Sequence, residues 1–184
     1  VSEDLMGAFA GQHAAEAQPF DFEVCVLTHA HWPTFPDAHV ELPESLLQAQ
    51  RRFERFYATC HSGRSLTWKN ALGQMILVAN LGRTGVRELH ISTFQAAVLL
   101  LFNEVAGNEP LSYTHIQQRT GLEPVTLKRT LQSLACGAIP TRVLRKHPQG
   151  RDVDDSDSFT VNEALKNERR RIRINQIQMK DTPE

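Results

Sequence analysis

Apolar and polar residues alternate at two different spacings in the first half of the chain. Residues 20–28 alternate between apolar and acidic side chains and then become wholly apolar, which predicts a strand that is half buried at its start. Residues 43–60 carry apolar side chains at helical spacing after Pro43, which predicts an amphipathic helix. Further short apolar runs, separated by glycines, predict strands at 65–68, 75–79 and 88–92. We therefore expect a short helix beginning at Ser2, then a four-stranded antiparallel sheet with the second helix covering one face.

Helical spacing dominates the second half of the chain. Residues 94–103 are apolar nearly all round, which is typical of a buried helix. The next predicted elements are two helices followed by two strands, at 114–119, 123–135, 142–144 and 158–161. This order is typical of a winged-helix module, in which the acidic run 152–157 would be a solvated loop of the wing. The predicted fold class is therefore α+β.

Composition and charge narrow the class of protein. The chain has 184 residues, of which 41% are hydrophobic and 22% are charged, as in ordinary soluble globular proteins. Its 20 Lys and Arg residues oppose 21 Asp and Glu residues, and the net charge of -1 disfavours a strongly basic nucleic-acid binder. The three cysteines form no C-x-x-C pair, so we expect a reducing intracellular compartment and neither a disulfide framework nor a zinc site. No apolar run reaches the roughly 18 residues that a membrane span needs.

Residues with catalytic or metal-binding chemistry are present but poorly arranged. The chain contains no G-x-S-x-G, P-loop or G-x-G-x-x-G motif. His29, His31 and His39 could bind a metal, but they lie around a proline-rich segment without a cysteine or clustered carboxylates, so we interpret them as loop histidines. Cys60 and His61 are adjacent and are not expected to face each other as nucleophile and base. We therefore predict no catalytic residue, no metal and no cofactor.

The winged-helix order raises the possibility of DNA binding, with 123–135 as the recognition helix. Residues 93–162 contain seven basic and seven acidic side chains, however, and the wing itself is acidic. A module that reads duplex DNA needs a surplus of cations on this surface. We therefore favour a winged helix that contacts protein and keep a nucleic-acid-binding protein as the alternative.

Two other features suggest surfaces for partners. The arginine-rich stretch 169–173 is either a solvated strand edge that blocks pairing or a surface for an acidic partner or phosphate. Trp32 follows the first predicted strand and Trp68 ends the second, and either could be a core residue. A small sheet with open edges can nevertheless accept a strand from a partner, held by main-chain hydrogen bonds and selected by apolar pockets.

A set of short stretches is more specific together than any single motif. They are Leu27-Thr28 before Trp32-Pro33-Thr34, Phe56-Tyr57 before His61-Ser62-Gly63-Arg64, Leu66-Thr67-Trp68, Ser92-Thr93-Phe94-Gln95, Leu99-Leu100-Leu101-Phe102-Asn103, Arg129 to Gly137, Arg142-Val143-Leu144, and Arg173 to Lys180. Their order and spacing over nearly the whole chain resemble the cullin family. The stretch Ser133 to Gly137 fits the third and fourth subfamilies alike. The closing stretch resembles the fourth, and residues 138–141 resemble the third.

The resemblance implies the middle of a cullin C-terminal region. Residues 1–18 would end a helical bundle, 19–92 form the sheet domain, 93–165 the winged helix, and 166–184 a basic strand leading to a further domain. It implies a non-catalytic scaffold of a ubiquitin ligase, present in the cytoplasm and nucleus, that binds a RING-box protein and through it a ubiquitin-conjugating enzyme. The candidate RING-box contacts are Val24, Val26, Thr28, Trp32, Arg64, Leu66, Trp68, Leu77, Leu89 and Ile91.

The chain departs from the cullin pattern in several places. It starts at Val1 rather than Met and lacks the N-terminal helical repeats and the terminal winged helix with its neddylation lysine, so we expect a piece of a longer chain. No lysine here is therefore assigned as a neddylation site. Ala30 and His31 precede Trp32 where relatives carry glycine and an aromatic residue, which puts the tip of that loop in doubt.

Overall fold

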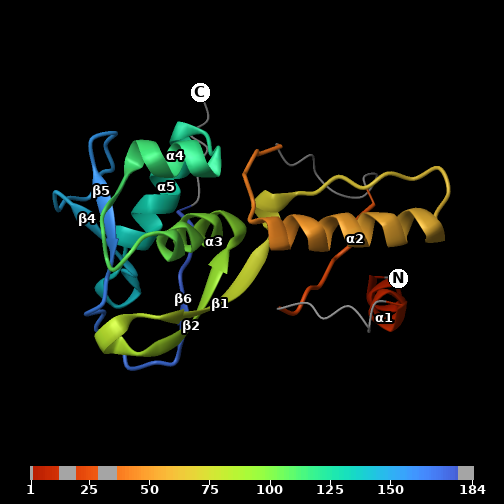
Figure 1. Ribbon diagram of the computed structural model, residues 1–184, viewed down its shortest axis with the longest axis horizontal. Coiled ribbons are helices and arrows are strands. Elements are labelled where there is room, and N and C mark those ends of the chain that lie inside the picture. Colours follow the sequence, from red (N-terminus) through yellow and green to blue (C-terminus); the bar gives the residue numbers. More distant parts are fainter. Residues whose placement is uncertain (1, 13–19, 29–36, 178–184) are drawn as a thin grey trace. The chain divides into compact units, whose positions relative to one another are not determined.

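The computed structural model describes residues 2–12, 20–28 and 37–177 (Figure 1). The chain divides into two compact units, and each is described here by itself. The first unit consists of residues 1–36 and 42–68, and the second of residues 37–41 and 69–184. Trp32 and the paired histidines His29 and His31 lie outside the described residues.

The first unit is built on the helix α2 (Glu44–Cys60), as predicted. Pro43 precedes it and Glu44 lies in its first turn, where a negative charge opposes the helix dipole. Its apolar face buries Ala49, Phe53, Phe56 and Tyr57. The N-terminal helix α1 (Ser2–Gln12) contributes Phe9, whose ring meets the rings of Phe53 and Phe56 edge-on at 5.4 Å. These aromatic contacts form the core of the unit.

The prediction of a four-stranded sheet is wrong in its first two strands. Neither 20–28 nor 65–68 is assigned to a strand. Their apolar side chains instead pack on the aromatic core around Phe53, which satisfies their burial without a neighbouring strand. An alternating pattern reports which side chains are buried, and it leaves open what the backbone pairs with.

The second unit contains the two remaining predicted strands, β1 (Gln74–Asn80) and β2 (Val86–Ser92). They pair in antiparallel fashion through a turn that includes the short 3-10 helix η3 (Gly82–Thr84) and Gly85 at φ 76°. The strand β6 (Arg171–Arg173), from the predicted basic segment, adds to β2 in parallel. The result is a three-stranded sheet in the order β1-β2-β6.

Helix α3 (Thr93–Leu100) follows β2 directly and packs on the inner face of this sheet (Figure 1). Ser92 and Gln95 form a capping box, in which each side chain bonds the backbone N–H of the other. The predicted helix continues to residue 104 as the 3-10 helix η4 (Leu101–Glu104). Gln95 is fully buried and donates from Nε2 to Ser133 Oγ at 2.8 Å, which ties α3 to a helix further along the chain.

The remaining elements include the two predicted helices and the two predicted strands in the expected order, although the strand predicted at 142–144 lies at 144–147. They are β3 (Leu111–Ser112), α4 (Tyr113–Thr120), α5 (Pro124–Ala135), β4 (Leu144–His147) and β5 (Ser158–Val161), together with the 3-10 helices η2 (Asn70–Leu72) and η5 (Ile139–Thr141). β3, β5 and β4 form the second three-stranded sheet. In Figure 1, α4 and α5 lie beside the β4–β5 hairpin. Gly121 ends α4 in the left-handed region at φ 63°.

The acidic run 152–157 is not fully solvated, contrary to the prediction. Asp157 is buried and accepts from Lys146 Nζ at 2.8 Å, with side-chain exposures of 3% and 6%. The amide of Asp154 also donates to the Asp157 carboxylate, at 2.7 Å. Val153 is buried as well, so the loop is anchored inward at two points.

Candidate partner-binding site

The first unit brings four of the predicted contact residues together. Val24 is buried and Val26, Leu66 and Trp68 are partly buried, all against one aromatic cluster. The Trp68 ring lies 6.2 Å from the ring of Phe53, and its Nε1 donates to Glu54 Oε1 at 2.5 Å. These side chains therefore hold two extended segments, 20–28 and 65–68, on a common apolar base.

Two further predicted contact residues have exposed side chains. Thr28 and Arg64 are exposed, and the structure gives neither a hydrogen bond nor an ion pair with the described residues. Trp32 lies outside the described residues. The hypothesis that a partner contributes a strand therefore depends on the backbone and the buried apolar side chains of the first unit. It does not depend on the polar side chains of Thr28 and Arg64.

The remaining predicted contacts lie in the second unit. Leu77 on β1 is directly opposite Leu89 on β2, and Ile91 is opposite Met75. Leu89 and Ile91 are buried on the face that α3 covers. No described segment pairs with the outer edge of β1, because this strand is terminal in the sheet. A partner strand at this edge would thus contact the backbone of β1. Leu89 and Ile91 would not be contacted directly, because they are buried between the sheet and α3.

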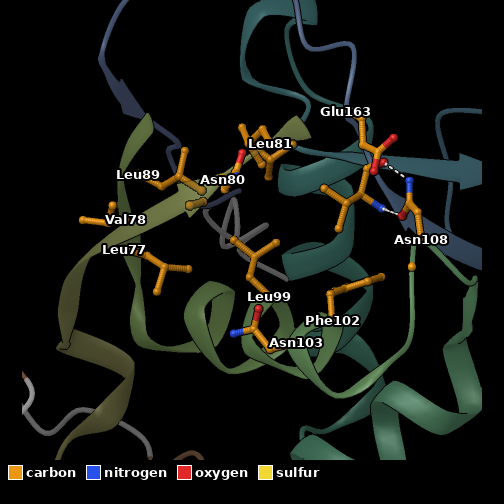
Figure 2. Close-up of a pocket in the computed structure, with 14 residues that line it drawn as sticks. Leu77, Val78, Asn80, Leu81, Leu89, Leu99, Phe102, Asn103, Asn108 and Glu163 are labelled. Atoms are coloured by element: carbon orange, nitrogen blue, oxygen red, sulfur yellow. Dashed lines mark hydrogen bonds between the residues drawn. The ribbon is translucent and has the colours of Figure 1, made fainter. Parts of the chain in front are cut away.

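A cavity of about 270 Å³ lies along β1, and sequence reasoning missed it. Figure 2 shows Leu77 from β1 and Leu99 and Phe102 from the α3–η4 segment around it, with Asn108 and Glu163 at its far side. The Asn108 side chain is engaged with both backbone groups of Val161, at 2.8 and 2.9 Å.

The size and lining of this cavity limit what it can hold. Ligand pockets usually measure about 300–1,000 Å³, so this cavity suits one large apolar side chain better than a cofactor. The apolar run 94–103 was a correct signal for burial, but a pocket beside a strand from another part of the chain leaves no periodic pattern in the sequence.

The arginine-rich stretch is partly paired on the surface. Arg170 Nε and Arg171 Nε lie 3.1 and 2.9 Å from the carboxylate oxygens of Glu88 on β2. The hydrogen bond from Arg171 lowers the pKa of Glu88, and the charges of Arg170 and Arg171 act in the same direction against partial desolvation. The last three residues of this stretch therefore form the edge strand β6, and ion pairs from Arg170 and Arg171 add to its pairing with β2.

The electrostatics of the helix–hairpin module disfavour DNA binding. Lys128, on the helix that would read DNA, bonds Asp155 at 2.9 Å and lies 5.6 Å from the centre of the Tyr113 ring. The hydrogen bond with Asp155 raises the pKa of Lys128. Arg119 makes a two-point contact with Glu104, at 2.5 and 2.8 Å. These cations are occupied by the module's own acids, so no described feature favours the nucleic-acid alternative.

A metal-binding cluster and a membrane-spanning helix are both absent from the described part of the chain. Within residues 2–12, 20–28 and 37–177, no three His, Cys, Asp or Glu side chains gather as metal ligands would. Among the described helices, none has the length and apolar character needed to cross a membrane.

Comparison with known proteins identifies the family. The family model of the cullin alpha+beta domain matches residues 26–165. Over the whole chain, the sequence is 43% identical to Cullin-4A of Mus musculus. It is 37% identical to Cullin-4 of Schizosaccharomyces pombe over 98% of the chain, and 35% identical to Cullin-3A of Arabidopsis thaliana over 96%. In each case the chain spans about a quarter (24%) of the length of the relative. The similarity to the third and fourth cullin subfamilies confirms the sequence-based prediction, and this chain belongs to the cullin family.

Proposed function

We propose that this chain is the part of a non-catalytic ubiquitin-ligase scaffold that binds a RING-box protein. One observation carries the proposal. Two extended segments of the first unit, 20–28 and 65–68, rest on an apolar core without being part of a sheet. In the second unit, β1 also ends its sheet with an open edge. A chain with several unoccupied strand positions suits a partner that contributes a strand.

Strand addition explains how such a partner would be held and selected. Main-chain hydrogen bonds from the incoming strand would supply affinity that depends little on sequence. Side chains alternate between the two faces of a strand, so every second residue of a strand on β1 would point toward α3. The cavity beside Leu77, Leu99 and Phe102 would then accept one large apolar side chain of the partner.

The scaffold would act by proximity. A RING-box protein held on this chain would recruit a ubiquitin-conjugating enzyme carrying ubiquitin, and the rest of the scaffold would hold the substrate. Linking the two raises their effective concentration without a catalytic group from the scaffold. The RING-box protein is thus the direct partner, the conjugating enzyme an indirect one, and the cytoplasm and nucleus the places of action.

The helix–hairpin module 93–165 would serve as a winged helix that contacts protein. Its order α3, β3, α4, α5, β4, β5 supports this assignment. Three of its seven Lys and Arg residues, Arg119, Lys128 and Lys146, are held in internal ion pairs. A role in positioning neighbouring domains therefore fits the module better than a role in reading DNA.

The proposal is tested by co-expressing this chain with a RING-box protein and separating the products by size exclusion. We expect a stable one-to-one complex that is lost when the N-terminal strand of the RING-box protein is deleted. In the chain itself, Leu99→Trp would fill the cavity and weaken the complex, whereas Ile139→Ser, at an exposed position outside the cavity, would not. A folded chain that forms no complex, or a complex indifferent to the strand deletion, would contradict the proposal.

A further inference from the structure

The outer face of the β1-β2-β6 sheet, opposite α3, carries an uncovered mixed surface. Across this face the side chains stand in cross-strand rows. One row is Val78, Glu88 and Arg171, and the neighbouring row is Ile76, His90 and Arg173. Each row thus runs from an apolar residue on β1, through a titratable residue on β2, to an arginine on β6. We call these six residues the outer-face rows.

The apolar side chains at the β1 end of the two rows are unusually exposed to solvent. Ile76 and Val78 are 64% and 68% exposed, although both belong to a paired strand. Scattered exposed apolar residues are ordinary, but neighbours on one face of a sheet are typical of a surface that another element covers. A groove of about 890 Å³ is lined by Ile76, His90 and Arg173 of this face, by Leu72, and by polar residues at the end of the sheet such as Ser92 and Asn175.

The charged ends of the two rows differ in one respect. In the Val78 row, the Glu88 carboxylate forms ion pairs with both Arg171 and Arg170. In the Ile76 row, the central residue is His90, and Arg173 has no ion pair with any described residue. His90 Nε2 is buried and lacks a hydrogen-bond partner in the described structure. The Ile76 row is therefore missing the carboxylate that its neighbour has.

We propose that the outer-face rows dock an amphipathic helix of a partner protein whose apolar stripe is bordered by acidic residues. A sheet face is normally buried by a helix layer. β1 and β6 are two strand spacings apart, about 9.6 Å, which is close to the width of one helix. A helix lying over β2 would therefore place its apolar stripe on Ile76 and Val78 and a carboxylate at Arg173.

This surface is separate from the strand-accepting edge of β1, because it uses side chains of the sheet face rather than the open backbone. Charge complementarity selects the occupant, since the exposed Arg173 guanidinium has no ion pair with any described residue and favours an anionic acceptor. The exposed ion pairs of Glu88 stay intact in the complex and fix the position of β6 beside the groove.

The test uses the purified chain and a fluorescent helical peptide of about 16 residues, with Leu at every third or fourth position and Glu along one border of that stripe. A second peptide carries Gln in place of each Glu. We expect the Glu peptide to bind in an anisotropy titration and the Gln peptide to bind about tenfold more weakly, the order expected for losing one hydrogen bond to a charged group.

Matched variants locate the binding. Arg173→Ala and Ile76→Ser should each weaken binding of the Glu peptide about tenfold. Arg169→Ala, on the same basic stretch, and Val125→Ser, an exposed apolar residue on α5 outside the groove, should leave binding within about twofold. Unchanged far-UV circular dichroism and melting temperature would show that all four variants are folded.

Several results would overturn the proposal. They are failure of the Glu peptide to bind, equal binding of both peptides, and equal effects of the groove and control variants. Loss of the RING-box complex in Arg173→Ala would also overturn it, because the RING-box protein itself would then be the occupant of this face. Retention of that complex, with loss of peptide binding, supports two separate surfaces and leaves the RING-box proposal to its own test.

Discussion

The buried ion pair between Lys146 and Asp157 makes the sharpest stability prediction. The substitution Asp157→Ala removes the carboxylate and leaves the ammonium of Lys146 in a site that is only 6% exposed. It also removes the acceptor of the Asp154 amide. Breaking a buried pair from one side costs about 3–5 kcal/mol, mainly because the remaining charge is unpaired. Since the neighbouring loop residues Asp152, Asp154 and Asp155 are exposed, the site lies close to solvent and we expect the lower end, about 3 kcal/mol.

This loss is large enough to measure by thermal unfolding. For a chain of this size, 1 kcal/mol corresponds to about 2–4 °C, so Asp157→Ala should lower Tm by about 6–12 °C. The double variant Lys146→Met/Asp157→Leu should recover most of that loss, because two apolar side chains leave no unpaired charge. The surface pair offers a matched control, since Asp155→Ala should change stability by less than about 1 kcal/mol.

The pH dependence follows from the same site. Burial alone would raise the pKa of Asp157, but the Asp154 amide and Lys146 outweigh it and hold the pKa below its ordinary value. A carboxyl whose folded pKa is depressed stabilises the fold above its unfolded pKa, which is about 3.9 for Asp. This contribution should be lost as pH falls below that value. A Tm change under about 2 °C at pH 7, or equal losses for the single and double variants, would refute the reasoning.

Three further predictions concern other parts of the chain. Ser133→Ala should cost about 1–3 kcal/mol in denaturant unfolding, because it leaves the buried Gln95 amide without its acceptor, and a cost below about 0.5 kcal/mol would contradict that role. Gly121→Ala should cost about 1 kcal/mol or more in the same assay, since the residue is in the left-handed region and a Cβ there would lie 3.0 Å from a carbon of the His39 ring. Phe53→Ala should cost about 3–5 kcal/mol in the unfolding of the first unit, and Val125→Ala, at an exposed position, should leave it unchanged.

The helices of this chain could be predicted from sequence because their signals are local. The apolar spacing of residues 43–60 and the apolar run 94–103 each act within a few residues, and the helices α2 and α3 appear where these patterns predict them. The candidate site could be predicted only in part, because it depends on contacts between residues that are far apart in the sequence. Whether 20–28 pairs with another strand depends on what else is available as a neighbour, and the alternation of its side chains is the same in either case.

The charged positions show the same limit. Residues 152–157 look solvated by composition, yet Asp157 is buried because Lys146, on a strand that precedes the loop, reaches its carboxylate. The arginine stretch was predicted as a strand, but its parallel pairing with β2 joins residues far apart in sequence. Long-range partners of this kind are selected by the folded structure as a whole.

The parallel pairing of β6 with β2 also has a consequence for how the protein is made. Glu88 and Arg171, which bond across these two strands, are 83 residues apart, and the entire helix–hairpin module is synthesised between them. At about 5–20 residues per second, the first two strands wait roughly 4–17 seconds for the third to leave the ribosome. During that interval the β1–β2 hairpin has two open edges, and a strand from another chain can compete for either. Completion of the sheet is therefore a late event, coupled to the emergence of β6, and the order of synthesis determines when each edge is available.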